Sequence, residues 1–445
     1  MSGLFRALRK ALGFSKAPKR AILPIRDLAK FAEGERVLVD GLKLSAPLQK
    51  NGSSNYKNGL LPHNDIIGKP LSSFYIRGPK GIYKIDAPTL DDYVSLTPRL
   101  VTPVYANYAS SIVSLLDIHP IPWTDEKSPV SSPLEILEAG TGHGSLTLHI
   151  SRAIAAANPP PLNIPVPQYQ KNESQQPEPA LETGVRQAWS EWKQSRRAIL
   201  HTVEKVEANR WHAEKIVRGY RQGLYWPHVD FYAGDASTWI QAQSTQRKLS
   251  TWNPFASTSE DGFLDYVLLD MPGVHTQLQY VSGAMRDGAK VVVFTPSVTQ
   301  IGECAKAIQD SNLPLVMERV LELGEGISTG RRWDVRMVMP RKHKDRSKPS
   351  TTEPVAGVEM DKEPPQIDSN EDDDSIVEKA ALEALGDRLP EEQPDEPVMI
   401  CRPLVGERTM GGGFIALFKK ISPESAAIAA EWRRGQTGWA KKRNR

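Results

Sequence analysis

A strand-like run that ends in an acidic residue leads into a glycine-rich turn at residues 136–156, ILEAGTGHGSLTLHISRAIAA. Three glycines stand at every second position, and a helical pattern of apolar residues follows at once. In a strand–turn–helix unit of this kind, the glycines let a ligand approach the backbone and the helix N-terminus favours an anionic group. The stretch therefore predicts a nucleotide-type ligand bound at the turn.

The spacing of the glycines separates two candidate ligands. A dinucleotide fingerprint, GxGxxG, needs a glycine at its sixth position, but that position is Ser145 counted from Gly140 and Thr147 counted from Gly142. Glu138, just before the turn, would repel a pyrophosphate and would suit the cationic end of S-adenosylmethionine (SAM). The pattern thus favours SAM over a dinucleotide.

Each of the next three predicted strands also ends in an acid. Glu204 closes the second strand, where a carboxylate can accept both ribose hydroxyls; Asp235 closes the third, near an adenine amino group; Asp270 closes the fourth. In open α/β sheets the ligand lies outside the carboxyl ends of the strands, so these acids and Glu138 are expected to converge. Any one of them alone is more often a helix N-cap or a solvated turn residue. Together they predict a SAM-dependent methyltransferase.

The elements that must position these acids follow a regular alternation. Predicted strands cover residues 134–139, 198–204, 229–235, 264–270 and 290–296, and predicted helices between them cover 145–157, 208–222, 277–285 and 297–311. This order indicates an α/β fold, a doubly wound and mostly parallel sheet of the class I (Rossmann-like) methyltransferase type. Alternating apolar and polar residues at 35–44 and 81–88 predict a small antiparallel β domain before it.

Changes in composition mark the expected parts of the chain. Proline-, serine- and charge-rich stretches interrupt the alternation and predict loop insertions or disorder. We expect a presequence at 1–32, the small β domain at 33–92, the methyltransferase domain at 93–341 with insertions near 158–196 and 241–261, an acidic disordered insertion at 342–396, closing strands of the sheet at 397–420, and a basic tail at 421–445.

The charge of the chain is unevenly distributed. Residues 353–396 hold sixteen acidic and three basic residues, a local charge of −13. Because the whole chain has a net charge of +3, the residues outside this stretch carry +16. A basic body of this size favours a polyanionic partner such as nucleic acid, with a solvated basic surface as the alternative. Cys304 and Cys401 stand far apart and no histidine has metal-ligand spacing, so neither a disulfide framework nor a metal site is predicted. The longest apolar runs fall far short of the roughly 18 residues of a membrane span, so no membrane association is expected.

The first 26 residues indicate a subcellular location. They hold seven basic residues and no acidic one, and Leu4, Phe5, Leu8 and Leu12 fall on one helical face. This is typical of a mitochondrial presequence cleaved before the β domain. A basic tail on a nuclear protein is the alternative.

Several stretches carry a resemblance to a known family. The sequences at 136–154, 201–216, 265–273 and 290–308 are similar to the catalytic subunit of the tRNA (adenine-58-N1)-methyltransferase family, whose pattern is E-x-G-T-G-S-G-S, T-x-E, L-D-x-P and F-S-P-x-x-x-Q. LPHNDIIGKPLSS at 61–73 resembles the family's H-x-D-I-I-G-K-x-x-G. The resemblance covers roughly 33–341 and 397–420, interrupted by insertions.

The resemblance implies the activity and the roles of the site residues. The protein would form N1-methyladenosine at adenine 58 of tRNA, as a homo-oligomer or in a complex with a non-catalytic paralogous subunit. Asp270 would be catalytic and face the target adenine, Gln300 would match the family's glutamine, and the residues holding SAM would be Glu138, Gly140, Gly142, Gly144, Ser145, Glu204 and Asp235.

The sequence departs from the family pattern at three places and leaves two alternatives open. His143 replaces the usual serine of the glycine turn, Tyr108 stands where aspartate is common, and residues 271–275 lack the family's second proline and tryptophan. One alternative is the non-catalytic tRNA-binding subunit, although that subunit has lost the cofactor motifs present here. The other is a methyltransferase of the same fold acting on another nucleobase or on a protein. N6-adenine enzymes usually carry [DN]PP[FYW], and DMPG at 270–273 has no aromatic residue.

Overall fold

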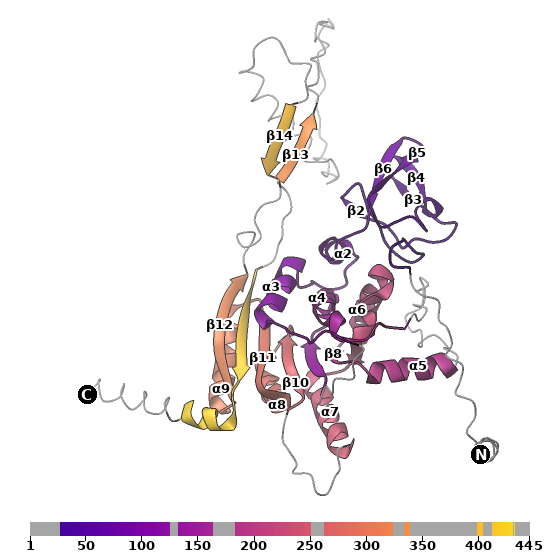
Figure 1. The fold of residues 1–445 in the computed structure, drawn as a ribbon. Helices are drawn as coiled ribbons and strands as arrows, with labels where there is room; N and C mark the ends of the chain where they lie inside the picture. Colours follow the sequence, from indigo (N-terminus) through magenta and orange to yellow (C-terminus); the bar gives the residue numbers. More distant parts are fainter. Residues whose placement is uncertain are drawn as a thin grey trace, which may run out of the picture. The chain divides into compact units, whose positions relative to one another are not determined.

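The structure is a computed structural model, and it describes residues 27–124, 132–162, 183–250, 262–323, 333–338, 398–403, 412–429 and 431 (Figure 1). The chain divides into two compact units, which are described separately. The first comprises Met1–Glu325 and Met410–Arg445, and the second comprises Gly326–Thr409. None of the described helices is long and apolar enough to cross a membrane.

The N-terminal part of the first unit is a small antiparallel β domain, as the sequence predicts. Strands β1 (Leu38–Val39), β2 (Lys43–Leu44), β5 (Phe74–Gly78) and β6 (Gly81–Asp86) pair in the order β2-β1-β6-β5, and β3 (Ser53–Tyr56) and β4 (Gly59–Pro62) form a separate hairpin. Val37, Tyr83 and Ile85 are fully buried in its core.

The β domain begins earlier than the sequence predicts. Phe31 is 2% exposed in the same core, and its backbone bonds with Lys69 and Gly68. A presequence ending at residue 32 would remove this buried ring, so the predicted boundary between 32 and 33 is wrong. The remainder of the predicted presequence, residues 1–26, lies outside the described residues.

A seven-stranded sheet forms the larger part of this unit (Figure 1). Its order is β12-β15-β11-β10-β7-β8-β9, with β7 (Leu134–Ala139), β8 (Ala198–Glu204), β9 (Val229–Ala233), β10 (Leu264–Leu269), β11 (Met285–Thr295), β12 (Leu315–Leu323) and β15 (Gly413–Lys420). Strands β9, β8, β7, β10 and β11 run parallel, and β15 runs antiparallel to both of its neighbours. The predicted strands 134–139 and 198–204 coincide with β7 and β8.

Helices cover both faces of this sheet. Successive strand residues point to opposite sides, and apolar residues on both sides pack against helices. Ile136, Leu200 and Leu268 pack in one hydrophobic cluster, and Leu137, Val203 and Leu269 pack in the other. The first cluster includes residues of α2 (Leu90–Leu96), α3 (Ala106–Leu116), α4 (Ser145–Ile154), α5 (Thr183–Gln194) and α6 (Glu207–Gly219). The second includes residues of α7 (Ala236–Ser250), α8 (Leu278–Ala284) and α9 (Val298–Asp310). The doubly wound class I fold is thereby confirmed.

Parts of the two predicted insertions are helical in the described residues. Part of 158–196 folds as α5, where the rings of Trp189 and Trp192 stack on each other and Trp189 stacks on Trp226. Helix α7 continues to Ser250, well into the predicted loop at 241–261. Aromatic burial explains α5, because its tryptophans join the core despite polar neighbours. Residues 163–182 and 251–261 lie outside the described part of the chain.

The second unit contains one pair of described strands. β13 (Trp333–Val338) and β14 (Val398–Pro403) pair antiparallel over six residue pairs in a sheet of their own. We expected both stretches within 397–420 to close the large sheet, and that is wrong for β14, since its hydrogen-bonding partner is β13; only β15 joins the large sheet. The acidic stretch 342–396 lies outside the described residues, as does most of the tail 421–445, in which residues 423–429 are helical.

Candidate active site

The order in which the chain adds strands reverses between β7 and β10. After β7 the chain adds β8 and β9 on one side, and it then returns to add β10 on the other side. Ligands of doubly wound sheets bind at the carboxyl ends of strands beside such a switch point. The Gly140 amide donates to the Val203 carbonyl at 3.0 Å, and the Asp270 amide donates to the Ala139 carbonyl at 2.9 Å. A Cβ on Gly140 would lie 1.8 Å from the Asp270 carbonyl oxygen, so the glycine turn and Asp270 are in direct contact.

The glycine turn is shaped by residues with positive φ. Gly140, Gly142 and Gly144 have φ of +91°, +54° and +83°, a region that favours glycine. Ser145 then begins α4, and its buried hydroxyl has no hydrogen-bond partner among the described residues. The helix start and this hydroxyl offer donors to a ligand anion.

Glu138 is the deepest acid of the site. It is 1% exposed, and its Oε2 accepts a hydrogen bond of 2.7 Å from the Thr147 hydroxyl. Within the described part of the chain, its buried Oε1 has no partner. Burial, with the nearby acids Asp270 and Glu204, raises the pKa of Glu138 to about 8. A cationic ligand group beside Oε1 would stabilise the ionised carboxylate.

Glu204 fastens the glycine turn to the end of β8. Its Oε2 accepts from the Gly142 amide at 3.0 Å, and its Oε1 accepts from the Val206 amide at 3.1 Å. The sequence predicts this residue only as a ribose ligand and does not reveal its bonds to the backbone. A carboxylate has about four acceptor sites, so these two bonds leave sites on Glu204 that can accept hydrogen bonds from a ligand.

Asp235 acts as a helix cap in this structure. Its Oδ2 accepts from the Ser237 amide at 3.1 Å and from the Ser237 hydroxyl, at the start of α7. Asp235 follows β9, two strands away from β7, and lines an open pocket of about 540 Å³ beside that edge strand. The capping role is the alternative that the sequence left open for each acid taken alone.

Asp270 is half-buried at the end of β10. Burial and the charge of Glu204 raise its pKa to about 7, so the carboxyl changes protonation state near neutral pH. The loop after it turns at Gly273, with φ of +69°, and His275 Nδ1 lies 3.3 Å from Glu303 of α9. In α9, the buried Oε1 of Gln300 has no partner among the residues that the structure describes.

The structure thus brings Glu138, Glu204 and Asp270 into one electrostatic group beside the glycine turn. Thr147, which orients Glu138 from the first turn of α4, is not among the site residues predicted from the sequence. A threonine two residues after Ser145 was the available signal, since that position faces the end of the preceding strand.

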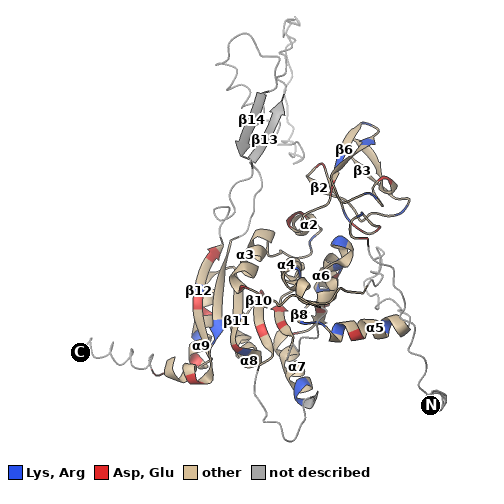
Figure 2. Cartoon of the chain, viewed as in Figure 1, with Lys and Arg blue, Asp and Glu red and all other residues tan. Residues whose placement is uncertain are grey.

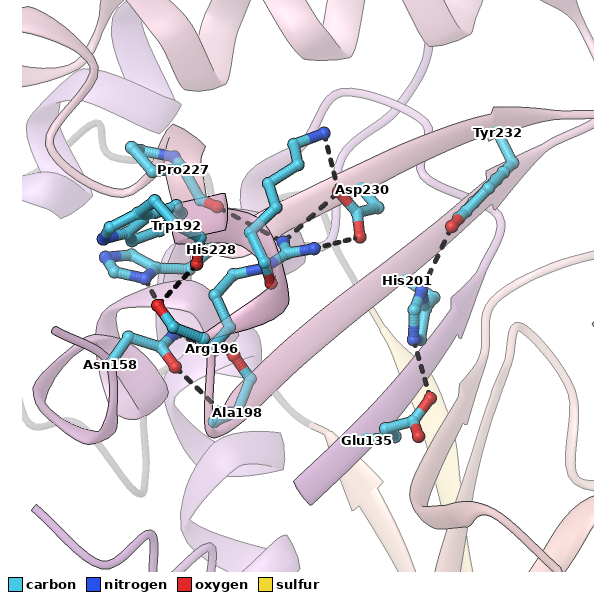
Figure 3. A network of polar contacts seen from close by, with 12 residues as sticks. Glu135, Asn158, Trp192, Arg196, Ala198, His201, Pro227, His228, Asp230 and Tyr232 are labelled. Atoms are coloured by element: carbon cyan, nitrogen blue, oxygen red, sulfur yellow. Dashed lines mark hydrogen bonds and ion pairs between the residues drawn. The ribbon is translucent and has the colours of Figure 1, made fainter. Parts of the chain in front are cut away.

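A second group of polar contacts involves the amino-terminal part of the same strands (Figure 3). Arg196 points toward Asp230 and donates to it at 2.6 Å, and His201 lies 3.0 Å from Glu135. The Asn158 side chain donates to the Ala198 carbonyl at 2.8 Å. This group ties the ends of the insertion to the sheet. The described residues contain no cluster that could hold a metal ion.

Comparisons with known proteins show which sequences and folds this chain is similar to. No protein-family model matches the sequence. The tRNA (adenine(58)-N(1))-methyltransferase TrmI of Thermus thermophilus is 24% identical over 297 residues, 65% of this chain and 82% of that protein. A SAM-dependent O-methyltransferase from Thermotoga maritima superposes with a TM-score of 0.50 at 14% identity, covering 89% of this chain and 97% of that one. The TrmI from Aquifex aeolicus, a tRNA (m1A58) methyltransferase, aligns over 88% of this chain and 99% of its own, at 16% identity and a TM-score of 0.44.

The strand order, the antiparallel β15 and the glycine turn at the switch point define the class of the fold. It is the fold of the class I SAM-dependent methyltransferases, which the Thermotoga structure shares.

Proposed function

We propose that the protein is a SAM-dependent methyltransferase that forms N1-methyladenosine at adenine 58 of tRNA. The observation that carries the proposal is the pair of acids at the switch point, the buried Glu138 and the half-buried Asp270, beside the glycine turn, with pKa values raised to about 8 and about 7. The similarity to TrmI over 65% of this chain supports the choice of tRNA as substrate.

The residues present fit SAM. Glu138 Oε1 is buried without a partner in the described residues, and the charged groups acting on this carboxyl are both acidic. A ligand ammonium would therefore relieve a buried negative charge. Glycine backbone and the Ser145 hydroxyl would face the anionic end, while Glu204 would accept the ribose hydroxyls and Asp235 would lie near the adenine.

The chemistry assigned to Asp270 follows from its position and its pKa. When bound, SAM supplies an electrophilic methyl group. Adenine N1 is a weak nucleophile because it is a pyridine-type ring nitrogen of low basicity, and methylation leaves positive charge that is shared between the ring and the exocyclic amino group. Asp270 would accept a hydrogen bond from N6, stabilise the developing cation and take the N6 proton. Positioned bases contribute roughly 10²–10⁴-fold, and a pKa of about 7 suits this task.

The charge of the chain fits an RNA substrate. The protein outside 353–396 carries a net charge of +16, and Figure 2 shows basic residues on several elements, α6 among them. Neutralisation of phosphates by such groups supplies affinity for tRNA. We propose further that the protein acts in mitochondria, from the basic and acid-free residues 1–26, and that it works as a homo-oligomer or with a non-catalytic paralogous subunit.

The test is methyl transfer from labelled SAM to a tRNA transcript by the purified protein, alone and with the partner subunit. We expect incorporation that is lost when adenine 58 is replaced by guanine, with N1-methyladenosine as the product on digestion. Incorporation that persists with guanine 58 would indicate another target base. SAM binding without transfer in either preparation would favour another class of substrate, and absence of SAM binding would favour the non-catalytic subunit.

A further inference from the structure

The segment between α2 and α3 lies against the glycine turn. The Thr97 hydroxyl is 3.0 Å from Nε2 of His143, which stands in the turn between Gly142 and Gly144. The next residue, Pro98, accepts a hydrogen bond of 3.0 Å at its carbonyl from Nε2 of His212 in α6. We call residues 97–101 the linker and these two contacts the linker clamp.

Hydrogen-bond accounting fixes the tautomer of His143. The Thr97 hydroxyl donates its hydrogen to the Tyr93 carbonyl at 2.7 Å, so it can only accept from the imidazole. Nε2 therefore carries the proton, and Nδ1 is a buried lone pair without a partner in the described part of the protein. Burial, together with the neighbouring His212, lowers the pKa of His143 to about 4, which keeps the ring neutral at physiological pH.

Apolar contact completes the cover over the turn. A Cβ on Gly142 would lie 3.5 Å from Cγ2 of Val101, and the rings of His143 and His212 have centroids 5.5 Å apart. His143 is 1% exposed. The linker therefore shields the same turn whose Gly142 amide is bound by Glu204.

The clamp also connects the turn to the preceding domain. The Tyr93 hydroxyl of α2 donates to the Ile216 carbonyl of α6 at 2.9 Å, and α2 begins at Leu90, shortly after β6 ends at Asp86. Displacement of α2 would thus move Thr97 away from His143. The turn and the linker are in contact, so ordering one of them reduces the conformational entropy of the other. A ligand that rigidifies the turn will therefore also rigidify the linker.

We propose that His143 is a positioning residue of the cofactor site: with His212 it holds the linker against the glycine turn, so that SAM binding and linker docking stabilise each other. The inference rests on the proposed binding of SAM and not on the target base. A serine at position 143, the usual residue of the resembling family, is too short to reach Thr97 as the imidazole does, so the clamp is a feature of this chain.

The first test measures SAM affinity by calorimetry. We expect His143→Ala to weaken binding by about threefold to tenfold, the loss that one neutral hydrogen bond produces. His143→Gln, whose side-chain amide can donate to Thr97, should restore affinity to within about twofold of the wild type. Thr97→Val also loses the hydrogen bond to the Tyr93 carbonyl, so it should weaken binding at least as much as His143→Ala does. Adding His143→Ala to Thr97→Val should cause little further loss, because both substitutions remove the contact between Thr97 and His143.

The second test separates positioning from simple folding. In the wild-type protein, SAM should slow hydrogen exchange at the amides of residues 97 and 99–101, and in His143→Ala this protection should be largely lost. His228→Ala is the matched control, since His228 is 3% exposed and bonds to Asn158 in the second polar group (Figure 3). That variant should retain SAM affinity and the exchange response, even if its stability falls.

The outcomes distinguish this inference from the proposed function. Absence of SAM binding by the wild-type protein would overturn both. Wild-type binding with unchanged affinity and unchanged linker protection in His143→Ala would overturn the clamp alone. Should His143→Ala fail to fold, Thr97→Val compared with Thr97→Ser makes the same decision, because only serine keeps the hydroxyl that His143 contacts.

Discussion

Replacing Glu138 by glutamine should increase stability while reducing cofactor binding. The carboxyl has an ordinary pKa of 4.5 when unfolded and a pKa of about 8 in the folded, ligand-free protein. A carboxyl with a raised folded pKa contributes stability below pH 4.5 and loses it as pH rises through 8. At pH 7 the folded protein must take up a proton that the unfolded chain lacks, which costs about 3 kcal/mol at 1.36 kcal/mol per pH unit.

Glu138→Gln removes this cost and keeps an acceptor for the Thr147 hydroxyl. We expect the variant to be more stable than the wild type by up to about 3 kcal/mol at pH 7, with the difference vanishing near pH 4.5. Urea unfolding at pH 4.5 and pH 7 measures this difference. SAM affinity should fall by about tenfold or more, since a charge-assisted hydrogen bond contributes roughly 1.5–3 kcal/mol.

Glu135→Gln is the matched control at the other end of β7. Burial tends to raise the pKa of Glu135, but its bonds to His201 and Arg247 outweigh this and lower it. The control should therefore lose stability at pH 7 and retain SAM affinity. If Glu138→Gln were instead less stable than the wild type at pH 7 and bound SAM normally, both the electrostatic reasoning and the assignment of Glu138 would be refuted.

Three further predictions follow from the site and the N-terminus. Glu204→Ala should weaken SAM binding by about tenfold or more, because it removes both the proposed ribose contacts and the hydrogen bond that holds Gly142; normal calorimetric affinity in the folded variant would remove Glu204 from the site. Asp270→Asn should keep SAM and tRNA binding while kcat falls by about 100-fold or more, and wild-type kcat/KM should decline as pH drops below about 7, because the base must be ionised; near-normal single-turnover rates would assign the base elsewhere. A reporter fused to residues 1–26 should enter mitochondria, and a nuclear or cytosolic signal would contradict the proposed address.

The sequence alone was sufficient to predict those elements whose signals are local in the chain. Strands β7 and β8 and the glycine turn were predicted because short apolar runs, glycine spacing and terminal acids are all local signals. The partners of those acids were not predictable. The bonds of Glu204 to Gly142 and of Glu138 to Thr147 depend on how separate elements pack, which one sequence does not reveal.

Errors arose where pairing or burial overrode composition. The stretch at β14 has strand character, but nothing local distinguishes pairing with β13 from pairing with β15. Helix α5 lies in a predicted insertion because most of its residues are polar, but its two tryptophans are each only 6% exposed. Phe31 was assigned to a presequence because a boundary drawn from charge cannot register a single buried ring.

The pairing of β13 with β14 has a consequence for the length of chain that can connect the two strands. Val338 and Val398 are partners in the register, so the polypeptide departs and returns at neighbouring points. The entropy of closing a loop grows only logarithmically, by about 0.6 kcal/mol for each doubling of its length. A longer or shorter connection between these valines would therefore change the closure entropy of the β13–β14 pair only slightly. The seven-stranded sheet contains neither strand, so its own hydrogen bonds do not depend on this pair.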